Sequence, residues 1–218
     1  MMSKKKTYAV FGLGRYGKSV AQELNDNGVE VLAVDMDEEL VNSCATELPY
    51  CKCADVTDPD VIKQLGISNM DVVVVAMANN LEASVMATML CKEAGVETVI
   101  VKCASEMNCK ILKKVGADRV VFPENESGIR LAKNLLSSGF VDLLDISKDV
   151  SMVDLEVKPE WIGKSLIELN LRKKYSINVV AIIQEDSISI NIDPNLPLEG
   201  TMRLIVIANP VGLAKFAD

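Results

Sequence analysis

The strongest constraint on the fold is an alternation of short Val and Ile runs with segments of helical length between Thr7 and Phe122. Runs such as "VVVV" at residues 72–75 are apolar at every position, which is typical of strands covered on both faces. Parallel strands need crossovers of helical length, and segments of that length separate the runs. Strands are expected at residues 8–11, 30–34, 50–53, 71–76, 98–102 and 119–122, and helices at 16–27, 38–47, 59–64, 81–94, 107–115 and 124–138. This pattern predicts an α/β fold with a doubly wound parallel sheet.

The pattern changes near Ser151, where apolar and polar residues begin to alternate as in strands with one wet face. Further strands at 179–183 and 204–207, with a helix at 164–174, predict a small α+β C-terminal domain. The apolar segment "FVDLLDI" at 140–146 precedes it and is expected to pack either on its own domain or on a second subunit. The predicted division is residues 1–138, a connecting dimer segment at 139–148, and residues 149–218.

Composition narrows the classes of function. The net charge of −8 and the lack of a basic half argue against a nucleic-acid partner. No apolar run approaches the roughly 20 residues of a membrane-spanning helix, and no secretion signal is recognisable, so a cytoplasmic protein without direct membrane insertion is expected. The chain has no histidine, which argues against many enzyme mechanisms and against a zinc site. Its six cysteines form no CxxC pair and are expected to be reduced.

The stretch "GLGRYG" places Gly12, Gly14 and Gly17 directly after a predicted strand and at the start of a predicted helix. This is the context of a dinucleotide-binding turn, in which glycines allow the tight turn, the approach of a phosphate, and close packing of helix on strand. Asp35 ends the second predicted strand, where a carboxylate can accept both ribose hydroxyls and would repel a 2′-phosphate. A Rossmann-like domain that binds an adenine nucleotide other than NADP is therefore predicted.

Other side chains fall at the same edge of the predicted sheet. Arg15, beside Tyr16 in the glycine turn, is suited to a third phosphate or to a nucleotide of a neighbouring subunit; otherwise it is a solvated arginine. Asp55 either reaches the adenine amino group or caps a turn, and Lys102 either neutralises phosphate or is an ordinary exposed lysine. Glu124 either binds Mg²⁺ or Ca²⁺ beside phosphates or serves as an acid at a helix N-terminus.

Several stretches carry a family resemblance. "YAVFGLGRYGKSVAQEL", "ADVTD", "VVVVAMANNLEAS" and "GADRVVFPE" resemble the TrkA-N domain of RCK proteins, and "WIGKSLIELNLRKKYSINVVAI" resembles their TrkA-C domain. The order of the two domains is similar to that of Ktr-type cytosolic regulatory subunits of bacterial potassium uptake systems. The resemblance implies dimers that form an octameric ring on a membrane potassium-translocating subunit, activated by ATP and inactivated by ADP.

The resemblance also implies roles for single residues. Arg15 would reach the γ-phosphate across the dimer, Glu124 would bind the divalent cation, and the segment after Gly139 would be a dimer-crossover helix. Arg172 and Asn178 match positions that hold cyclic di-AMP in some members. The rival functions are an NAD-dependent oxidoreductase and an NADH-sensing regulator, and NAD(H) is an alternative ligand within the family. We expect a regulator without enzymatic activity.

Overall fold

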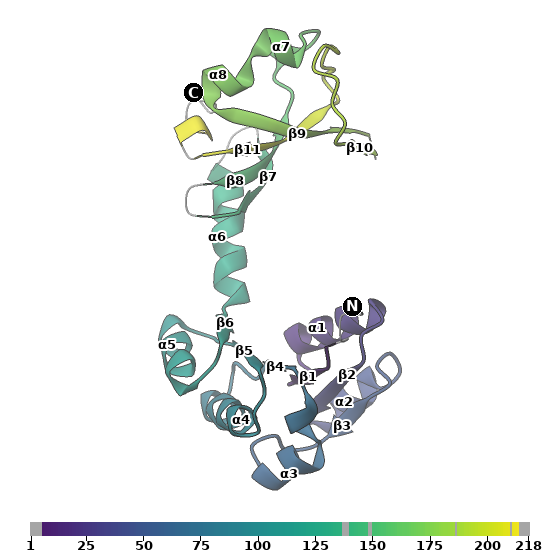
Figure 1. Ribbon diagram of the computed structural model, residues 1–218, viewed down its shortest axis with the longest axis vertical. Helices are drawn as coiled ribbons and strands as arrows, with labels where there is room; N and C mark the ends of the chain where they lie inside the picture. The colour runs from purple at the N-terminus through teal and green to yellow at the C-terminus, as the bar shows by residue number, and fades with distance from the viewer. Residues whose placement is uncertain (1–5, 137–139, 148–149, 186, 210, 214–218) are drawn as a thin grey trace. The chain divides into compact units, whose positions relative to one another are not determined.

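The computed structural model describes residues 6–136, 140–147, 150–185, 187–209 and 211–213 (Figure 1). The chain forms two compact units, residues 1–123 and 124–218. Each unit has its own buried hydrophobic residues. Within the described residues, the helices are too short or too polar to cross a lipid bilayer.

The first unit is built on a six-stranded parallel sheet in the order β3-β2-β1-β4-β5-β6. The reversal of strand order between β1 and β4 is the switch point of a doubly wound fold, so the predicted fold class is confirmed. The strands are β1 (Tyr8–Phe11), β2 (Val31–Asp35), β3 (Cys51–Cys53), β4 (Val72–Val75), β5 (Thr98–Lys102) and β6 (Arg119–Val121). The crossovers contain α1 (Arg15–Asp26), α2 (Glu38–Cys44), α3 (Pro59–Gln64), a 3₁₀ turn (Ile67–Asn69), α4 (Leu81–Glu93) and α5 (Glu106–Val115).

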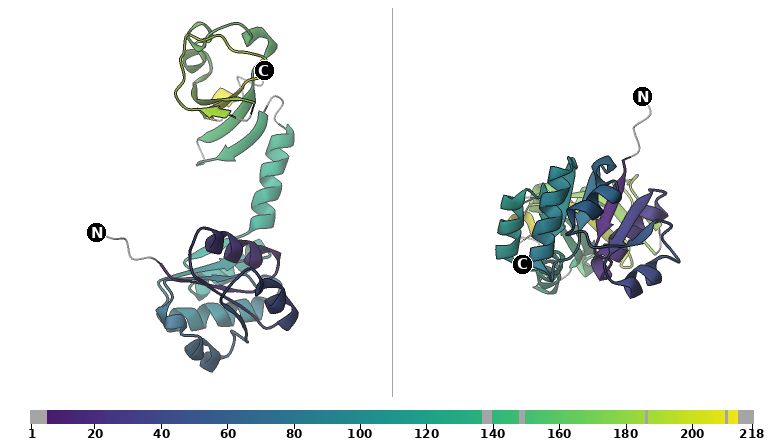
Figure 2. Two further views of the ribbon diagram at one scale, coloured as in Figure 1. Left: turned by 90° about the vertical axis from the view of Figure 1, so that its right-hand side faces the viewer. Right: turned by 90° about the horizontal axis from the view of Figure 1, so that it is seen from below.

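The continuous apolar strands are explained by two cores, one on each face of this sheet. Val73 and Val75 pack in the cluster that also contains residues of α3, α4 and α5. Their neighbour Val74 packs in the opposite cluster with residues of α1 and α2. Successive strand residues point to opposite faces, so helices on both sides require an apolar residue at every position (Figures 1 and 2).

The second unit contains a five-stranded sheet in the order β10-β9-β11-β8-β7, with antiparallel pairing throughout. Val153 and Leu155 of β8 and Leu204 and Val206 of β11 are fully buried around the buried Trp161. The elements of the second unit are α6 (Pro123–Leu136), β7 (Phe140–Asp145), β8 (Ser151–Glu156), a 3₁₀ turn (Pro159–Trp161), α7 (Leu166–Leu169), α8 (Leu171–Tyr175), β9 (Ile177–Gln184), β10 (Ser187–Ser189) and β11 (Arg203–Ala208). The predicted small α+β domain is confirmed.

Two local expectations for this unit were wrong. Residues 140–145 form β7, paired antiparallel with β8, instead of the crossover helix that the resemblance implied. A short hairpin explains the strand, because the amides of Ile146 and Ser147 both donate to the Val150 carbonyl and return the chain along β7. The helix predicted at 164–174 is divided into α7 and α8 at Asn170, which has a left-handed φ of 49°.

The compact units also divide the chain before the predicted boundary at residue 138. The division falls at residues 123/124, so nearly all of α6 belongs with the C-terminal unit. Residues 137–139 and 148–149 lie outside the described residues. A separate dimer segment at 139–148 stays a prediction.

Candidate functional site

The glycine turn connects β1 to α1 at the switch point of the sheet. Gly12 has a φ of +91°, and an added Cβ would lie 2.9 Å from the Cγ atom of Met77. A Cβ on Gly17 would lie within 1.8 Å of the Gly12 carbonyl oxygen, so this helix can start against the turn only with glycine there. Gly14 differs, because no atom of the described residues lies within 4 Å of a Cβ added there. The first and third glycines are thus required for packing, while the second leaves the turn open to solvent.

Among the described residues, no side chain caps the N-terminus of α1. Gly14 is the N-cap, and the first turn contains no acidic residue. The helices that follow β2 and β4 differ, because Asp37 accepts from the amides of α2 and Asn80 accepts from the Ala83 amide of α4. A 12-residue helix with free first-turn amides and a positive dipole end is suited to bind a phosphate group.

Asp35, at the end of β2, is hydrogen-bonded to the glycine turn. Its Oδ2 accepts a hydrogen bond of 2.6 Å from the Leu13 amide, and its Oδ1 accepts one of 2.9 Å from the Asp37 amide. Each carboxylate oxygen has a further lone pair that can accept from a ribose hydroxyl. The spacing between the glycine turn and Asp35 predicted the ribose position. The hydrogen bond from the Leu13 amide to Asp35 could not be predicted in this way, because it has no local sequence signal.

Lys102 and Tyr16 connect two elements of the same edge. The Lys102 ammonium, at the end of β5, lies 5.3 Å from the centroid of the Tyr16 ring in the first turn of α1. This is a cation–π distance, and it places a positive charge beside the helix N-terminus. The structure therefore brings together Tyr16, Lys102 and the glycine turn, which the sequence predicted as one site.

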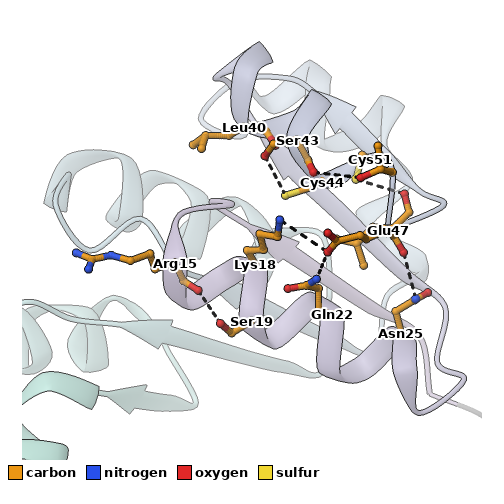
Figure 3. A network of polar contacts seen from close by, with 12 residues as sticks. Arg15, Lys18, Ser19, Gln22, Asn25, Leu40, Ser43, Cys44, Glu47 and Cys51 are labelled. Atoms are coloured by element: carbon orange, nitrogen blue, oxygen red, sulfur yellow. Dashed lines mark hydrogen bonds and ion pairs between the residues drawn. The ribbon is translucent and has the colours of Figure 1, made fainter.

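Arg15 is exposed, and among the described residues its guanidinium has no hydrogen-bond or ion-pair partner. Figure 3 shows its side chain directed away from the polar network that lies along α1. In that network the Lys18 ammonium lies 3.7 Å from a Glu47 oxygen, and Gln22 donates to the same carboxylate. Two basic residues of the same helix thus differ, because Lys18 has an intramolecular partner and Arg15 is available for a ligand.

Two further predicted residues, Asp55 and Glu124, are both exposed. Asp55 is exposed, and its Oδ1 accepts from both the amide and the hydroxyl of Thr57, at 2.9 and 2.7 Å. These hydrogen bonds from Thr57 lower the pKa of the Asp55 carboxyl, which keeps it ionised. Glu124 is exposed in the first turn of α6, at the start of the second unit. No cluster of three metal-ligating side chains occurs in the described part of the chain.

The expectation that all six cysteines are reduced was wrong for one pair. Cys103 and Cys109 form a disulfide, with their Cα atoms 5.3 Å apart. Ser105 caps α5 and turns the chain back, so that the first turn of α5 faces the end of β5 across only six residues. The remaining cysteines are free, and burial raises the pKa of the Cys91 thiol to about 12.

The second unit contains a cavity of about 460 Å³ between α7, α8 and β9. Arg172 and Asn178, the two residues predicted to hold a second ligand, both line it together with Asn170. The two short helices end at Asn170 and Ser176, which both have left-handed angles, and Asn170 is among the residues that line the cavity. The family resemblance suggested the two side chains, and the structure adds that they line one cavity.

Two known protein domains match the sequence, one in each part of the chain. Residues 8–123 match the TrkA-N domain and residues 150–218 match the TrkA-C domain. The chain is 37% identical to Ktr system potassium uptake protein C of Bacillus subtilis (strain 168) over 97% of this chain and 96% of that protein. It is 34% identical to Ktr system potassium uptake protein A of the same organism, over 99% and 97%.

Among solved structures, the GsuK channel bound to NAD resembles the chain with a TM-score of 0.66 at 13% identity. The alignment covers 99% of this chain but only 39% of the GsuK chain, and at that identity it supports the fold alone. Both domains and their order thus agree with the resemblance carried by the sequence. The chain belongs to the RCK family of TrkA-N/TrkA-C proteins and is of the Ktr type.

Proposed function

We propose that the chain is a nucleotide-sensing regulatory subunit of a potassium transporter. The observation that carries this proposal is the N-terminus of α1, where no described side chain caps the helix and the Arg15 guanidinium has no partner among the described residues. The names of the Ktr relatives support the link to potassium uptake. In this proposal an octameric ring built from dimers docks on the cytoplasmic face of a separate membrane translocating subunit. The chain acts there by binding and not by catalysis.

The physiological ligands in this proposal are ATP and ADP. The α1 amides and Lys102 hold the phosphates that both ligands share, and Asp35 accepts the ribose hydroxyls. The planar, charged guanidinium of Arg15 then donates hydrogen bonds to the γ-phosphate, either of the ATP bound by the same subunit or of the ATP bound by the neighbouring subunit. Glu124 binds a divalent cation, Mg²⁺ or Ca²⁺, next to the phosphates. A ligand that contacts Arg15 in one ring shape only would shift the equilibrium between two shapes.

NAD(H) is the second candidate ligand. The Asp35 carboxylate, which accepts from the Leu13 and Asp37 amides, can accept ribose hydroxyls of a dinucleotide as well as those of ATP or ADP. The GsuK channel, which has been solved bound to NAD, has the same fold. Calorimetric titration of one preparation with ATP, ADP, NAD and NADH separates the candidates. We expect ATP and ADP to bind and NADH to bind more weakly; tight NADH binding without ATP binding would overturn the proposal.

The Tyr16 ring is expected to hold Lys102 in position for phosphate. Replacing Tyr16 with Leu removes the cation–π contact, which is worth about 0.5–1 kcal/mol at an exposed site and corresponds to roughly two- to fivefold weaker ATP binding. The variant Tyr16→Phe retains the aromatic face and serves as the control. Calorimetry on the two variants tests this role, and an equal loss of affinity in both would contradict it.

Cyclic di-AMP is the proposed ligand of the C-terminal cavity, because Arg172 and Asn178 line the same space. An arginine and an amide suit a phosphodiester and a base edge, respectively. We expect Arg172→Ala to weaken cyclic di-AMP binding about tenfold or more, as loss of a charged hydrogen bond does, without changing ATP affinity. The neighbouring exposed Lys173, which is not among the residues lining the cavity, provides the control Lys173→Ala. Unchanged binding of cyclic di-AMP by Arg172→Ala would exclude the site.

A further inference from the structure

The disulfide between Cys103 and Cys109 lies directly beside the candidate phosphate site. Cys103 follows Lys102 at the end of β5, and its amide donates to the Val121 carbonyl of β6 at 2.9 Å. Cys109 lies in the first turn of α5, where its amide donates to the Ser105 carbonyl. The sulfur bridge therefore closes the turn that leaves the strand carrying Lys102.

The two sulfurs differ in access. Cys103 is 1% exposed and belongs to the core of the first unit, whereas Cys109 is only partly buried against that core. An external thiol therefore meets Cys109 first, and Cys103 acts as the protected second thiol. A disulfide in a reducing compartment is usually transient and regulatory, so a partly accessible pair beside a ligand site has the arrangement of a redox site.

We propose that Cys103 and Cys109 form a reversible thiol–disulfide site that reacts with small thiols and disulfides of the glutathione type, and that its state changes nucleotide affinity through Lys102. The coupling to nucleotide rests on the proposed function, but the thiol–disulfide site does not. The structure described above corresponds to the oxidised state.

The oxidation conserves atoms and electrons. The Cys109 thiolate attacks one sulfur of a small disulfide, forms a mixed disulfide and releases one small thiolate. The Cys103 thiol then loses its proton, its thiolate attacks the Cys109 sulfur, and the second small thiolate leaves. The protein pair is oxidised by two electrons, the small disulfide is reduced to two thiols, and these take up the two protons. Reduction by excess small thiol is the reverse sequence, beginning with attack on the Cys109 sulfur.

The backbone provides the coupling to the nucleotide. In the oxidised state the residue after Lys102 is fixed to β6 by a hydrogen bond and to α5 by the sulfur bridge. Lys102 is thereby held with its ammonium 5.3 Å from the Tyr16 ring centroid. Reduction removes the bond to α5 and allows the strand end more conformations, so phosphate binding must then order Lys102. Oxidised protein therefore binds nucleotide more tightly, and by reciprocity bound nucleotide makes the disulfide harder to reduce.

The test uses the full chain equilibrated in glutathione buffers of increasing oxidised fraction. Trypsin cleaves after Lys102 and Lys110 and releases residues 103–110, a peptide that holds both sulfurs. Mass spectrometry after alkylation should show this peptide changing from two alkylated thiols to an internal disulfide, and the change should need more reductant to reverse when ATP is present. Calorimetry should give an ATP affinity about fivefold or more higher for the oxidised protein.

Two variants complete the test. Cys109→Ser removes the accessible sulfur and leaves Cys103 in the core, so its ATP affinity should be the same in reducing and oxidising buffer. Cys51→Ser, which changes a free cysteine at the start of β3, should respond to redox buffer as the natural chain does.

Three outcomes would overturn the inference or part of it. If Cys103 and Cys109 were both alkylated at every glutathione ratio, no disulfide would have formed and the redox site would be excluded. An internal disulfide that forms without a change in ATP affinity would exclude the coupling. If neither state bound any nucleotide, the coupling and the proposed function would both fail, whereas the peptide measurement would still decide the thiol–disulfide site.

Discussion

Replacing Arg15 with Ala is expected to weaken ATP binding about 10- to 100-fold and ADP binding by less than about threefold, because a charge-assisted hydrogen bond contributes about 1.5–3 kcal/mol. The Arg15 guanidinium has no partner among the described residues, so the variant removes a ligand contact without breaking an intramolecular one. The α1 amides that hold the shared phosphates remain in place. Calorimetry with both nucleotides measures the difference.

The matched control for this experiment is Lys18→Ala. Lys18 lies in the same helix and carries the same charge, but its ammonium is directed to Glu47 at 3.7 Å (Figure 3). A general effect of lost positive charge would weaken ATP binding in both variants, whereas a specific contact weakens it in Arg15→Ala alone. Equal losses for ATP and ADP, or no loss, would rule out a γ-phosphate contact at Arg15.

Replacing Gly17 with Ala is expected to lower the free energy of unfolding by about 3 kcal/mol, as overpacking at a rigid contact does. The added Cβ would lie 1.8 Å from the Gly12 carbonyl oxygen, a backbone atom that cannot move aside as a flexible side chain could. Relief of this clash would require α1 to shift away from β1. Urea denaturation followed by circular dichroism measures the loss.

Gly14→Ala provides the contrast within the same turn. Gly14 has ordinary extended angles, φ −61° and ψ 178°, and no described atom lies within 4 Å of a Cβ added there. The free energy of unfolding of the variant should therefore change by less than about 0.5 kcal/mol. The new methyl group would instead occupy the approach of a phosphate to the α1 amides, and nucleotide affinity should fall. A stable Gly17→Ala variant would contradict the packing argument. Unchanged nucleotide binding by Gly14→Ala would contradict the proposed phosphate position.

The parallel sheet could be predicted because its signal is local. A strand buried on both faces must be apolar at each position, as in β4, and the glycines mark the turn at the end of β1. The second unit was predicted less exactly. Apolar residues at 140–146 do not distinguish a strand from a helix, and the hairpin bonds to Val150 decide between them. Asn170 is compatible with a helix in sequence, and only the observed left-handed conformation divides α7 from α8.

The site could be predicted as a set of residues but not as a network. Strand ends placed Asp35 and Lys102 at one edge, because carboxyl ends of parallel strands meet there. The bond from the Leu13 amide to Asp35, the contact between Tyr16 and Lys102, and the pairing of Cys103 with Cys109 depend on how separate elements pack. Nucleotide binding by these residues stays a prediction.

In the proposed function, the γ-phosphate changes the shape of an assembly without being consumed. Small-angle X-ray scattering on the full chain, saturated first with ADP and then with ATP in the presence of Mg²⁺, measures this most directly. We expect an oligomer in both states, with scattering profiles that differ between ATP and ADP and no release of phosphate during the measurement. Identical profiles for ATP- and ADP-saturated protein, with both ligands shown to be bound, would contradict it.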